Sequence, residues 1–301
     1  MYYVTEDDVD KNFDMKAAIN AVREAFEEYG KGRAYSSTRV RTFSQDGVLN
    51  TMPAAMEKYH ISGLKSYYAT RNGAKFVVVL FDTAADELLA IIEANRLGQI
   101  RTGAVTAYAT SILHKNVEIF AIIGSGFQAE TQLEGMLKVA NPTEIRVYSR
   151  NQEHARNFSE RSSKKFGVSI RAVESAEAAL IGADTITTIT NSNVPIVYRK
   201  YLGDEYHINL AGSNYINRRE AESAVLSDAN IVVTEHLEQS LIESVEISEY
   251  VKLGGKPIEL KDVAVDPTRY SKFHRTVFKS MGIGLEDIIS GYAVLKNMGI
   301  I

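Results

Sequence analysis

Residues 122–129 read IIGSGFQA and decide the fold of this chain. An apolar run enters the segment, two glycines and an alanine follow at the spacing GxGxxA, and a helix-forming stretch leaves it. In a dinucleotide-binding turn the first glycine permits the tight turn, the second lets the pyrophosphate approach the backbone, and the small third residue lets the helix pack on the strand. The spacing alone is a weak signal, because glycine also serves ordinary strand-to-helix turns. Its place between a strand and a helix favours a dinucleotide, and we assign cofactor contacts to Gly124, Ser125, Gly126, Phe127 and Gln128.

Strands and helices alternate around this turn from residue 117 onward. Helical segments at 127–139 and 152–166 are long enough to cross a sheet. The pattern predicts an α/β fold, a Rossmann domain with about six parallel strands. The short apolar segments that predict these strands are 117–123, 144–149, 168–173, 185–189, 207–211 and 231–234.

The residues before this region have a different pattern. A helix with one apolar face is expected at 14–30, with Asp14 as its cap, and a second helix at 101–113. Between them, short β-rich runs separated by Gly, Asn and Asp turns predict an antiparallel sheet with strands at 39–43, 48–52, 61–69, 75–81 and 87–93. A last helix at 284–297 is expected to pack on this α+β domain. The predicted domains are 1–115 with 283–301, and 116–282.

The end of the second Rossmann strand bears on the choice of cofactor. An NAD-binding domain usually has an acidic residue there, against the ribose hydroxyl, and so does a methyltransferase that binds S-adenosylmethionine. This chain has Ser149 and Arg150 instead. A guanidinium can bind a 2′-phosphate with two hydrogen bonds, whereas a carboxylate would repel it. We therefore expect NADP(H) to be preferred over NAD(H), although Arg150 could also be only a solvated residue before a helix.

Composition excludes several classes of protein. With 45% hydrophobic and 24% charged residues and a net charge of −4, we expect no nucleic-acid partner. No apolar run approaches the roughly 20 residues that span a bilayer, and the first residues lack the pattern of a signal peptide, so we expect a cytoplasmic protein without a membrane partner. The chain has no cysteine, and its six histidines never fall at a metal-ligand spacing, so we expect no metal.

Beyond the glycine turn, the chain resembles the ornithine cyclodeaminase/mu-crystallin family along nearly its whole length. The resemblance implies a first domain that binds substrate and forms a homodimer, a Rossmann domain, and a C-terminal helix that returns to the first domain. It is carried, in the family's order, by Arg41 with Met52-Pro53, by GLK at 63–65, EANRLGQIRTGA at 93–104, GSGFQA at 124–129 and TVFKSMG at 276–282.

Members of the family bind small α-amino or α-imino acids beside the nicotinamide, with basic residues on the carboxylate. Arg41, Lys65 and Arg101 stand at the matching positions. Three cations on separate elements are costly to bring together unless an anion neutralises them, and arginine suits a carboxylate. Each alone would more often be a surface residue. Lys65 is also a candidate catalytic residue, because an ammonium beside the substrate nitrogen could position or protonate the imine.

Further cofactor contacts are expected outside the glycine turn. Thr102 is expected to begin its helix, so that its hydroxyl could contact a phosphate, or else only satisfy the first backbone donors. The carboxyl end of the strand at 185–189 lies where open α/β sheets bind ligands. The residues assigned to the cofactor on these grounds, together with one lysine of the last family segment, are Thr102, Thr188, Thr190, Asn191 and Lys279.

The chain departs from the family at Asn214. Ornithine cyclodeaminases have an aspartate there as general base, and an amide cannot accept a proton near neutral pH. Asn214 can still hydrogen-bond the substrate nitrogen or the nicotinamide carboxamide, so we keep it, with Lys65 and Arg101, among the catalytic candidates. A second acidic group of the cyclodeaminases is also missing near Met52, where Asn50 and Thr51 stand.

Without these acids, the simpler reaction is NAD(P)H-dependent reduction of a small cyclic imino acid such as Δ1-pyrroline-2-carboxylate. Three alternatives stay open. They are ornithine cyclodeamination with recycled NAD, oxidative deamination of a small amino acid such as alanine, and a non-enzymatic protein that binds NADPH and a ligand. Retention of the three basic positions argues against the last.

Overall fold

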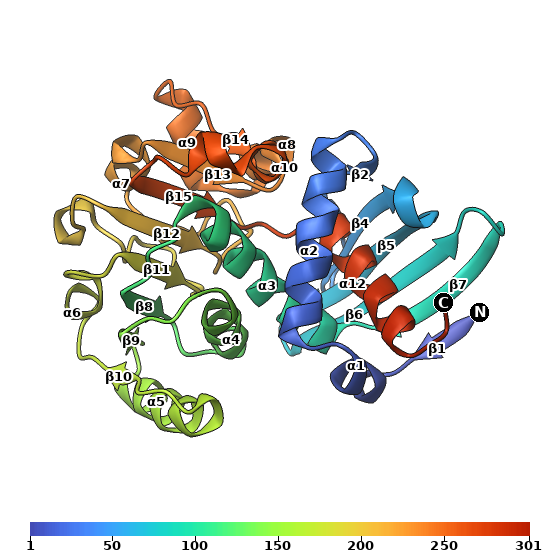
Figure 1. Cartoon of the computed structure of the whole chain (residues 1–301), viewed down its shortest axis with the longest axis horizontal. Coiled ribbons are helices and arrows are strands. Elements are labelled where there is room, and N and C mark those ends of the chain that lie inside the picture. The colour runs from blue at the N-terminus through green and yellow to red at the C-terminus, as the bar shows by residue number, and fades with distance from the viewer. The chain divides into compact units, whose positions relative to one another are not determined.

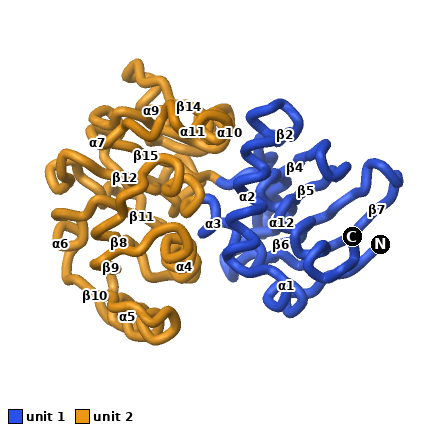
Figure 2. Tube along the Cα trace, viewed as in Figure 1, with its two compact units in different colours: residues 1–105, 282–301 blue, residues 106–281 orange.

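The computed structural model describes residues 1–301, which form two compact units (Figure 2). Unit 1 comprises residues 1–105 and 282–301, and unit 2 comprises residues 106–281. The sequence placed the first boundary ten residues later, at 115, because the chain changes character only there. The helix α3 (Asn95–Leu113) runs across residue 105 and therefore belongs to both units.

Unit 1 contains a seven-stranded sheet in the order β1-β7-β6-β5-β4-β2, with β3 also paired to β4. All pairs are antiparallel except that of β1 with β7, which confirms the expected antiparallel sheet. The strands β1 and β2 were not predicted, because a run of three residues is too short to show a recognisable strand pattern. The strands are β1 (Tyr2–Val4), β2 (Ala34–Ser36), β3 (Val40–Phe43), β4 (Val48–Met56), β5 (Ile61–Thr70), β6 (Gly73–Asp82) and β7 (Glu87–Glu93).

Helices cover one face of this sheet (Figure 1). The predicted helix is α2 (Met15–Gly30), and Asp14 caps it by accepting the N–H of Ala17 at 2.7 Å. The predicted C-terminal helix is α12 (Gly284–Asn297), which packs on β4, β5 and β6. A Cβ on Gly63 would lie 3.3 Å from Ile288, so helix and sheet meet closely here. The short helices α1 (Glu6–Asn12) and η1 (Glu57–Tyr59) complete the unit.

Unit 2 contains an eight-stranded, wholly parallel sheet in the order β10-β9-β8-β11-β12-β15-β13-β14. The expected number of about six is wrong by two. The sequence RTVFK of β15 has a basic residue at each end and does not look like a central strand, yet Thr276 to Lys279 are buried. The strands are β8 (Ile119–Ile123), β9 (Glu144–Tyr148), β10 (Arg171–Ala172), β11 (Thr185–Thr188), β12 (Tyr206–Leu210), β13 (Ile231–Thr234), β14 (Ile258–Glu259) and β15 (Arg275–Lys279).

Both faces of this sheet are buried, as a parallel sheet requires. Phe120 and Ile122 of β8 pack into a core with α4 and α5, whereas Ala121 and Ile123 pack into another core with α6, α7 and α9. No helix is long and apolar enough to cross a membrane. The helices are α4 (Ala129–Val139), α5 (Gln152–Phe166), α6 (Ala176–Leu180), η2 (Arg199–Tyr201), α7 (Ser223–Asp228), α8 (Leu237–Glu243), α9 (Val245–Lys252), α10 (Leu260–Val265) and α11 (Pro267–Tyr270).

The start of α3 corrects one expectation. The helix begins at Asn95 rather than at residue 101, because the Glu6 carboxylate accepts the N–H groups of Asn95 at 2.7 Å and Arg96 at 2.8 Å. Thr102 therefore lies in the second turn, not at the N-terminus. Its hydroxyl donates to the Gly98 carbonyl at 2.7 Å, and its contact with a phosphate stays a prediction.

Candidate functional site

The glycine turn joins β8 to α4 at the carboxyl edge of the unit 2 sheet. Gly124 has a φ of 115°, and a Cβ there would lie 2.5 Å from the Ile189 carbonyl oxygen, so only glycine fits. A Cβ on Gly126 would meet nothing within 4 Å, which leaves its backbone open to a ligand. Ala129, fully buried, then begins α4. A crowded first glycine, an open second one and a buried small residue fit the requirements of a bound pyrophosphate.

The strand order places this turn beside a topological switch point. From β8 the chain continues to β9 and β10 on one side, and then to β11 and β12 on the other. Dinucleotides bind at such a point, outside the carboxyl ends of the strands. The structure brings most of the expected cofactor residues to this edge, on the loops after β8, β9, β11 and β12. They are Gly124, Ser125, Gly126, Phe127, Gln128, Ser149, Arg150, Thr190, Asn191 and Asn214.

Two of these positions bear on the ribose phosphate. Ser149 follows β9 and is partly exposed, and the exposed Arg150 makes no hydrogen bond or ion pair. Asn151 comes next and caps α5 by accepting the N–H groups of Glu153 and His154. The guanidinium of Arg150 therefore has no structural task that would hold it away from an anion.

Two expected cofactor contacts are directed into the protein. Thr188 is fully buried, and its hydroxyl donates to the Asn209 carbonyl at 3.4 Å. Lys279 is also fully buried, and its Nζ lies 3.8 Å from the Glu246 carboxylate, without a hydrogen-bond partner. Both assignments are therefore corrected, because neither polar group is directed to the ligand edge. The sequence of β15, with a basic residue at each end, does not look like a buried strand, so the sequence alone does not predict that Lys279 lies within the sheet.

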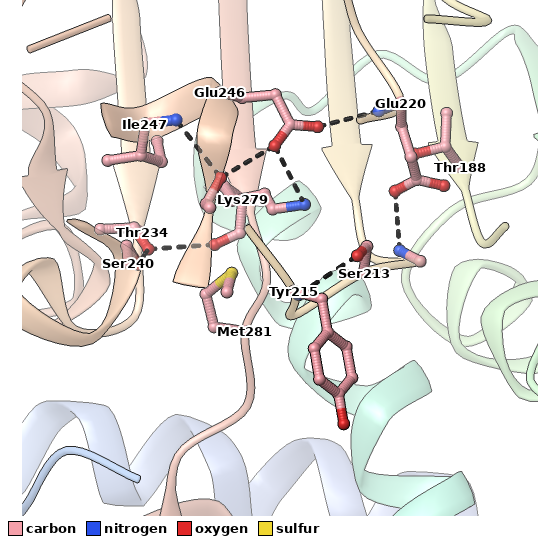
Figure 3. Close-up of polar contacts among 12 residues, drawn as sticks. Thr188, Ser213, Tyr215, Glu220, Thr234, Ser240, Glu246, Ile247, Lys279 and Met281 are labelled. Carbon is pink, nitrogen blue, oxygen red and sulfur yellow. Dashed lines mark hydrogen bonds and ion pairs between the residues drawn. The ribbon is translucent and has the colours of Figure 1, made fainter. Parts of the chain in front are cut away.

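Around Lys279 lies a buried polar network that holds the carboxyl-edge loops. Figure 3 shows Glu246 between the Lys279 ammonium and the backbone N–H of Glu220, which donates to Glu246 at 2.9 Å. Burial alone would raise the pKa of Glu246, but the Lys279 charge and several hydrogen bonds hold it below its ordinary value. The carboxylate of Glu220 in turn accepts hydrogen bonds from the loops after β11 and β12.

The expected substrate residues lie in unit 1, on two strands and one helix. Arg41 of β3 pairs in register with Asn50 of β4, and Asn50 pairs with Tyr67 of β5. Paired residues share a face of the sheet, and Lys65, two residues before Tyr67, shares that face too. Arg41 Nε donates to the buried Asn50 carboxamide at 3.2 Å. Arg41 and Lys65 therefore lie on the face covered by α12.

Two carboxylates at the start of α12 bind two of the three expected cations. Lys65 Nζ donates to Asp287 at 3.0 Å, and Arg101 Nε donates to the same oxygen at 2.9 Å. Arg101 Nη1 donates to Glu286 at 2.6 Å. All four side chains are buried, and the second oxygen of Asp287 has no hydrogen-bond partner. The protein itself thus supplies two carboxylates that neutralise these cations, and the expectation that this needs a bound anion is wrong.

Lys65 has a perturbed acidity in this cluster. Burial lowers the pKa of Lys65 to about 8, and the Arg101 charge contributes in the same direction, while Asp287 partly opposes both. The Arg39 guanidinium lowers this pKa further. The rings of Tyr67 and Phe76, stacked 5.0 Å apart, lie beside the ammonium. A lysine that titrates near 8 can exchange a proton at physiological pH.

Several residues of these clusters had no predicted role. Glu286 and Asp287 stand side by side between Leu285 and the apolar pair Ile288-Ile289, in a helix expected to pack on the first domain, and that was a usable signal. Arg39, two residues before Arg41, donates to the Gly282 carbonyl at 3.1 Å. Glu220 lies in a loop without a motif, so only the structure reveals it.

The chain is similar to known proteins along nearly its whole length. A sequence model of the ornithine cyclodeaminase/mu-crystallin family matches residues 2–298. A Δ1-pyrroline-2-carboxylate reductase of Bacillus cereus is 29% identical, over 96% of this chain and 94% of its own. The structure of the Thermococcus litoralis Δ1-pyrroline-2-carboxylate reductase with NADH and L-proline superposes with a TM-score of 0.91, at 28% identity over 99% and 97% of the two chains. An archaeal alanine dehydrogenase dimer with bound NAD gives 0.90, at 26% identity over 98% and 95%.

Proposed function

Because this chain belongs to the ornithine cyclodeaminase/mu-crystallin family, we propose that it is an NAD(P)H-dependent reductase of a small cyclic imino acid of the Δ1-pyrroline-2-carboxylate type. The observation that carries the proposal is the buried cluster of Lys65, Arg101 and Asp287, which provides a titratable ammonium beside a guanidinium. The similarity to two reductases of this name supports the choice of substrate.

Imine reduction needs groups that bind the substrate carboxylate and a group that can give a proton to the substrate nitrogen. Arg41 and Arg101 are assigned to the substrate carboxylate, because guanidinium groups bind carboxylates with two hydrogen bonds. Lys65 is assigned to the substrate nitrogen, where its ammonium can hold or donate a proton as the C=N electron pair moves to nitrogen. Asp287 fixes the positions of both Lys65 Nζ and Arg101 Nε. NAD(P)H supplies the hydride for the imine carbon, and the glycine turn and switch-point loops of unit 2 fit such a cofactor.

The amide residues argue against cyclodeamination. Asn214, in the loop after β12, stands where the family resemblance implies the aspartate of that reaction, and no carboxylate stands near Met52, where Asn50 and Thr51 are found. An amide can hydrogen-bond a substrate but cannot serve as a base. Oxidation of a small amino acid stays the second candidate, because the archaeal alanine dehydrogenase is similar over nearly the whole chain. Both candidate reactions move one hydride between the cofactor and a carbon that bears nitrogen.

For the cofactor we propose a preference for NADP(H), with NAD(H) also accepted. The support is local: Arg150 is exposed and uncommitted, Ser149 can donate a hydrogen bond, and no carboxylate follows β9 to repel a 2′-phosphate. The two similar structures bind NADH and NAD, so this preference would be a departure of this chain.

We also propose that the protein is a homodimer formed through unit 1. The face of its sheet opposite α12 carries large apolar side chains that are more than one-third exposed, namely Val40, Leu49, Tyr68 and Phe81. Leu49 and Tyr68 are direct neighbours across β4 and β5. An apolar patch of this kind is typical of a protein interface. The similar alanine dehydrogenase is a dimer.

A substrate screen tests the proposed function. The purified protein is given NADPH or NADH with Δ1-pyrroline-2-carboxylate, with its six-membered homologue and with acyclic imines, and the loss of absorbance at the nicotinamide band is followed. The reverse reaction is tried with L-proline, L-alanine and L-ornithine. Fastest oxidation of NADPH by a cyclic imino acid supports the proposal. Formation of reduced cofactor only with L-alanine would favour the second candidate, and ammonia release from ornithine without net cofactor turnover would contradict both.

A further inference from the structure

Glu220 is a buried carboxylate that the proposed chemistry does not use. Its Oε1 accepts hydrogen bonds from the backbone N–H and the hydroxyl of Thr190, each at 2.8 Å. Its Oε2 accepts the N–H of Gly212, also at 2.8 Å. Thr190 belongs to the loop after β11, and Gly212 belongs to the loop after β12. One fully buried side chain therefore ties these two loops together.

The two loops also meet backbone to backbone. A Cβ on Gly212 would lie 2.2 Å from both the nitrogen and the carbonyl oxygen of Thr190, and 2.3 Å from Glu220 Oε1. No side chain can be accommodated at that distance without moving one of the loops. The contact thus requires glycine at 212 and a carboxylate at 220.

Hydrogen bonds hold the backbone of Glu220 in place. Its N–H donates to Glu246 at 2.9 Å, and its carbonyl accepts the N–H groups of Ile196 at 2.8 Å and Val197 at 2.9 Å. Glu246 is held by the Lys279 ammonium (Figure 3). The backbone of Glu220 therefore has little freedom, and its carboxylate has a defined position from which to hold the loops.

The strand order indicates which half of a dinucleotide these loops would serve. The glycine turn follows β8. In Rossmann domains the adenosine ribose binds at the end of the next strand, here β9, which lies on one side of the switch point. The loops after β11 and β12 lie on the other side, which leaves them the nicotinamide half. They carry Thr190, Asn191 and Asn214.

We propose that Glu220 is a positioning residue for the nicotinamide half of the cofactor, acting through the loops after β11 and β12. The proposal rests on the proposed function in one respect, namely that unit 2 binds a nicotinamide dinucleotide. Glu220 itself touches neither cofactor nor substrate. It holds in place the residues that do.

The test compares two ligands in the variant Glu220→Gln. An amide keeps the size of the side chain but turns one acceptor into a donor, which then faces the N–H of either Thr190 or Gly212, so one loop is released. We expect the dissociation constant of NADH, measured by fluorescence titration, to rise about tenfold or more. ADP-ribose, which lacks the nicotinamide, should bind within about twofold of wild type by calorimetry, because the glycine turn is unchanged. A general loss of structure would weaken both ligands together.

Two further variants complete the test. Gly212→Ala keeps the carboxylate but forces the loops apart, and it should reproduce the selective loss of NADH, which also decides the matter if Glu220→Gln does not fold. Glu144→Gln is the control, since Glu144 binds Arg146 and Arg171 at the amino end of β9 and should bind both ligands as wild type does. Unchanged NADH binding in both loop variants, or equal weakening of NADH and ADP-ribose, would overturn the proposal. Neither titration needs turnover, so a failure to reduce imino acids would count only against the proposed function. A wild type that binds neither NADPH nor NADH would refute both.

Discussion

Opposing charges act on the ammonium group of Lys65. Burial and the guanidinium groups of Arg101 and Arg39 favour its neutral form, while the Asp287 carboxylate favours the charged form. The balance lowers the pKa of Lys65 from 10.5 to about 8. Lys65 is therefore protonated at neutral pH but close to losing its proton, which suits a group that serves an imine nitrogen.

This balance predicts a loss of activity in alkaline solution. If the charged form of Lys65 is required, kcat/KM for imine reduction should fall above about pH 8, approaching tenfold per pH unit. In Lys65→Arg the side chain stays charged, so this fall should disappear even if the rate at neutral pH is lower. The measurement is kcat/KM from pH 6.5 to 10 for both proteins, in which the titration of the substrate itself is common to both. Lys16→Arg, at an exposed position on α2, is the control. The same alkaline fall in Lys65→Arg as in wild type would remove Lys65 from the mechanism.

At the other site, Arg150 is expected to select the cofactor. Replacement by alanine removes a charge-assisted hydrogen bond to a 2′-phosphate, so KM for NADPH should rise about tenfold while KM for NADH stays within about twofold. Arg156→Ala, on the exposed side of α5, should change neither constant. Initial rates with the two cofactors measure the difference. A wild type that already prefers NADH, or an equal effect of Arg150→Ala on both cofactors, would show that Arg150 is only a solvated residue.

Among the elements, α3 is joined to the unit 2 sheet by a chain of buried polar side chains. His207 of β12 lies 2.7 Å from the Thr276 hydroxyl of β15 through Nδ1, and 3.2 Å from Asn209 Oδ1 through Nε2. The Asn209 amide donates to Thr110 of α3 at 3.0 Å. A neutral imidazole has one donor and one acceptor, which matches these partners. Burial, aided by the nearby His114, lowers the pKa of His207 to about 3.

This neutral histidine should make stability depend on pH. The unfolded chain binds a proton at His207 below about pH 6.5, whereas the folded chain does not until about pH 3, so stability falls as pH falls through that window. Between pH 7.5 and 5.5 His207 alone should cost about 1.4 kcal/mol of unfolding free energy. Urea unfolding of wild type and of His207→Gln at these two pH values measures the contribution as a difference. Equal pH dependence in the two proteins would contradict a neutral buried His207.

At this scale the sequence predicted elements whose pattern is local. Short β-rich runs between Gly, Asn and Asp turns predicted β4 to β7, and the capping residue and apolar face predicted α2. It failed where distant residues decide. The start of α3 depends on the Glu6 carboxylate, 89 residues away from Asn95, and the central strand β15 has basic residues at both ends. No pattern within a short window contains that information.

In the candidate site, too, residues within local motifs could be predicted, whereas contacts between distant residues could not. The three cations and the glycine turn were predictable, because each belongs to a short motif with a chemical reason. Their partners were not, since Asp287 lies 222 residues from Lys65 and Glu220 lies 30 residues from Thr190. Lys279 and Thr188 were assigned to the cofactor from position along the chain, and burial shows that their polar groups are used inside unit 2.

At the scale of the whole molecule, the residues assigned to the substrate and those assigned to the cofactor lie in different units. Unit 1 holds the cluster assigned to the substrate, and unit 2 holds the turn and loops assigned to the cofactor. Unit 1 has in addition the apolar sheet face that carries Leu49 and Tyr68, and the proposed dimer depends on it.

Charges on that face should separate the dimer. In the double variant Leu49→Lys with Tyr68→Lys, two neighbouring lysines would meet their copies or have to be desolvated, so the dissociation constant of the dimer should rise by several orders of magnitude. Light scattering after gel filtration should report a dimer for wild type and a chain of 33.4 kDa for the variant. Leu253→Lys, at an exposed apolar residue of unit 2, should stay dimeric. A monomeric wild type, or a double variant that stays dimeric, would place the interface elsewhere or abolish it.

Transfer of one hydride to an imine carbon is the central claim, and isotope transfer tests it most directly. The protein is incubated with Δ1-pyrroline-2-carboxylate and NADPH or NADH that carries deuterium at the transferred position of the nicotinamide, and the product is examined by mass spectrometry and NMR. We predict that the deuterium moves from the nicotinamide to the former imine carbon, so that the product is proline with one deuterium at Cα. One molecule of cofactor should be oxidised for each proline formed. Proline formed from ornithine with release of ammonia and no net cofactor oxidation, or no deuterium in the product, would contradict the account.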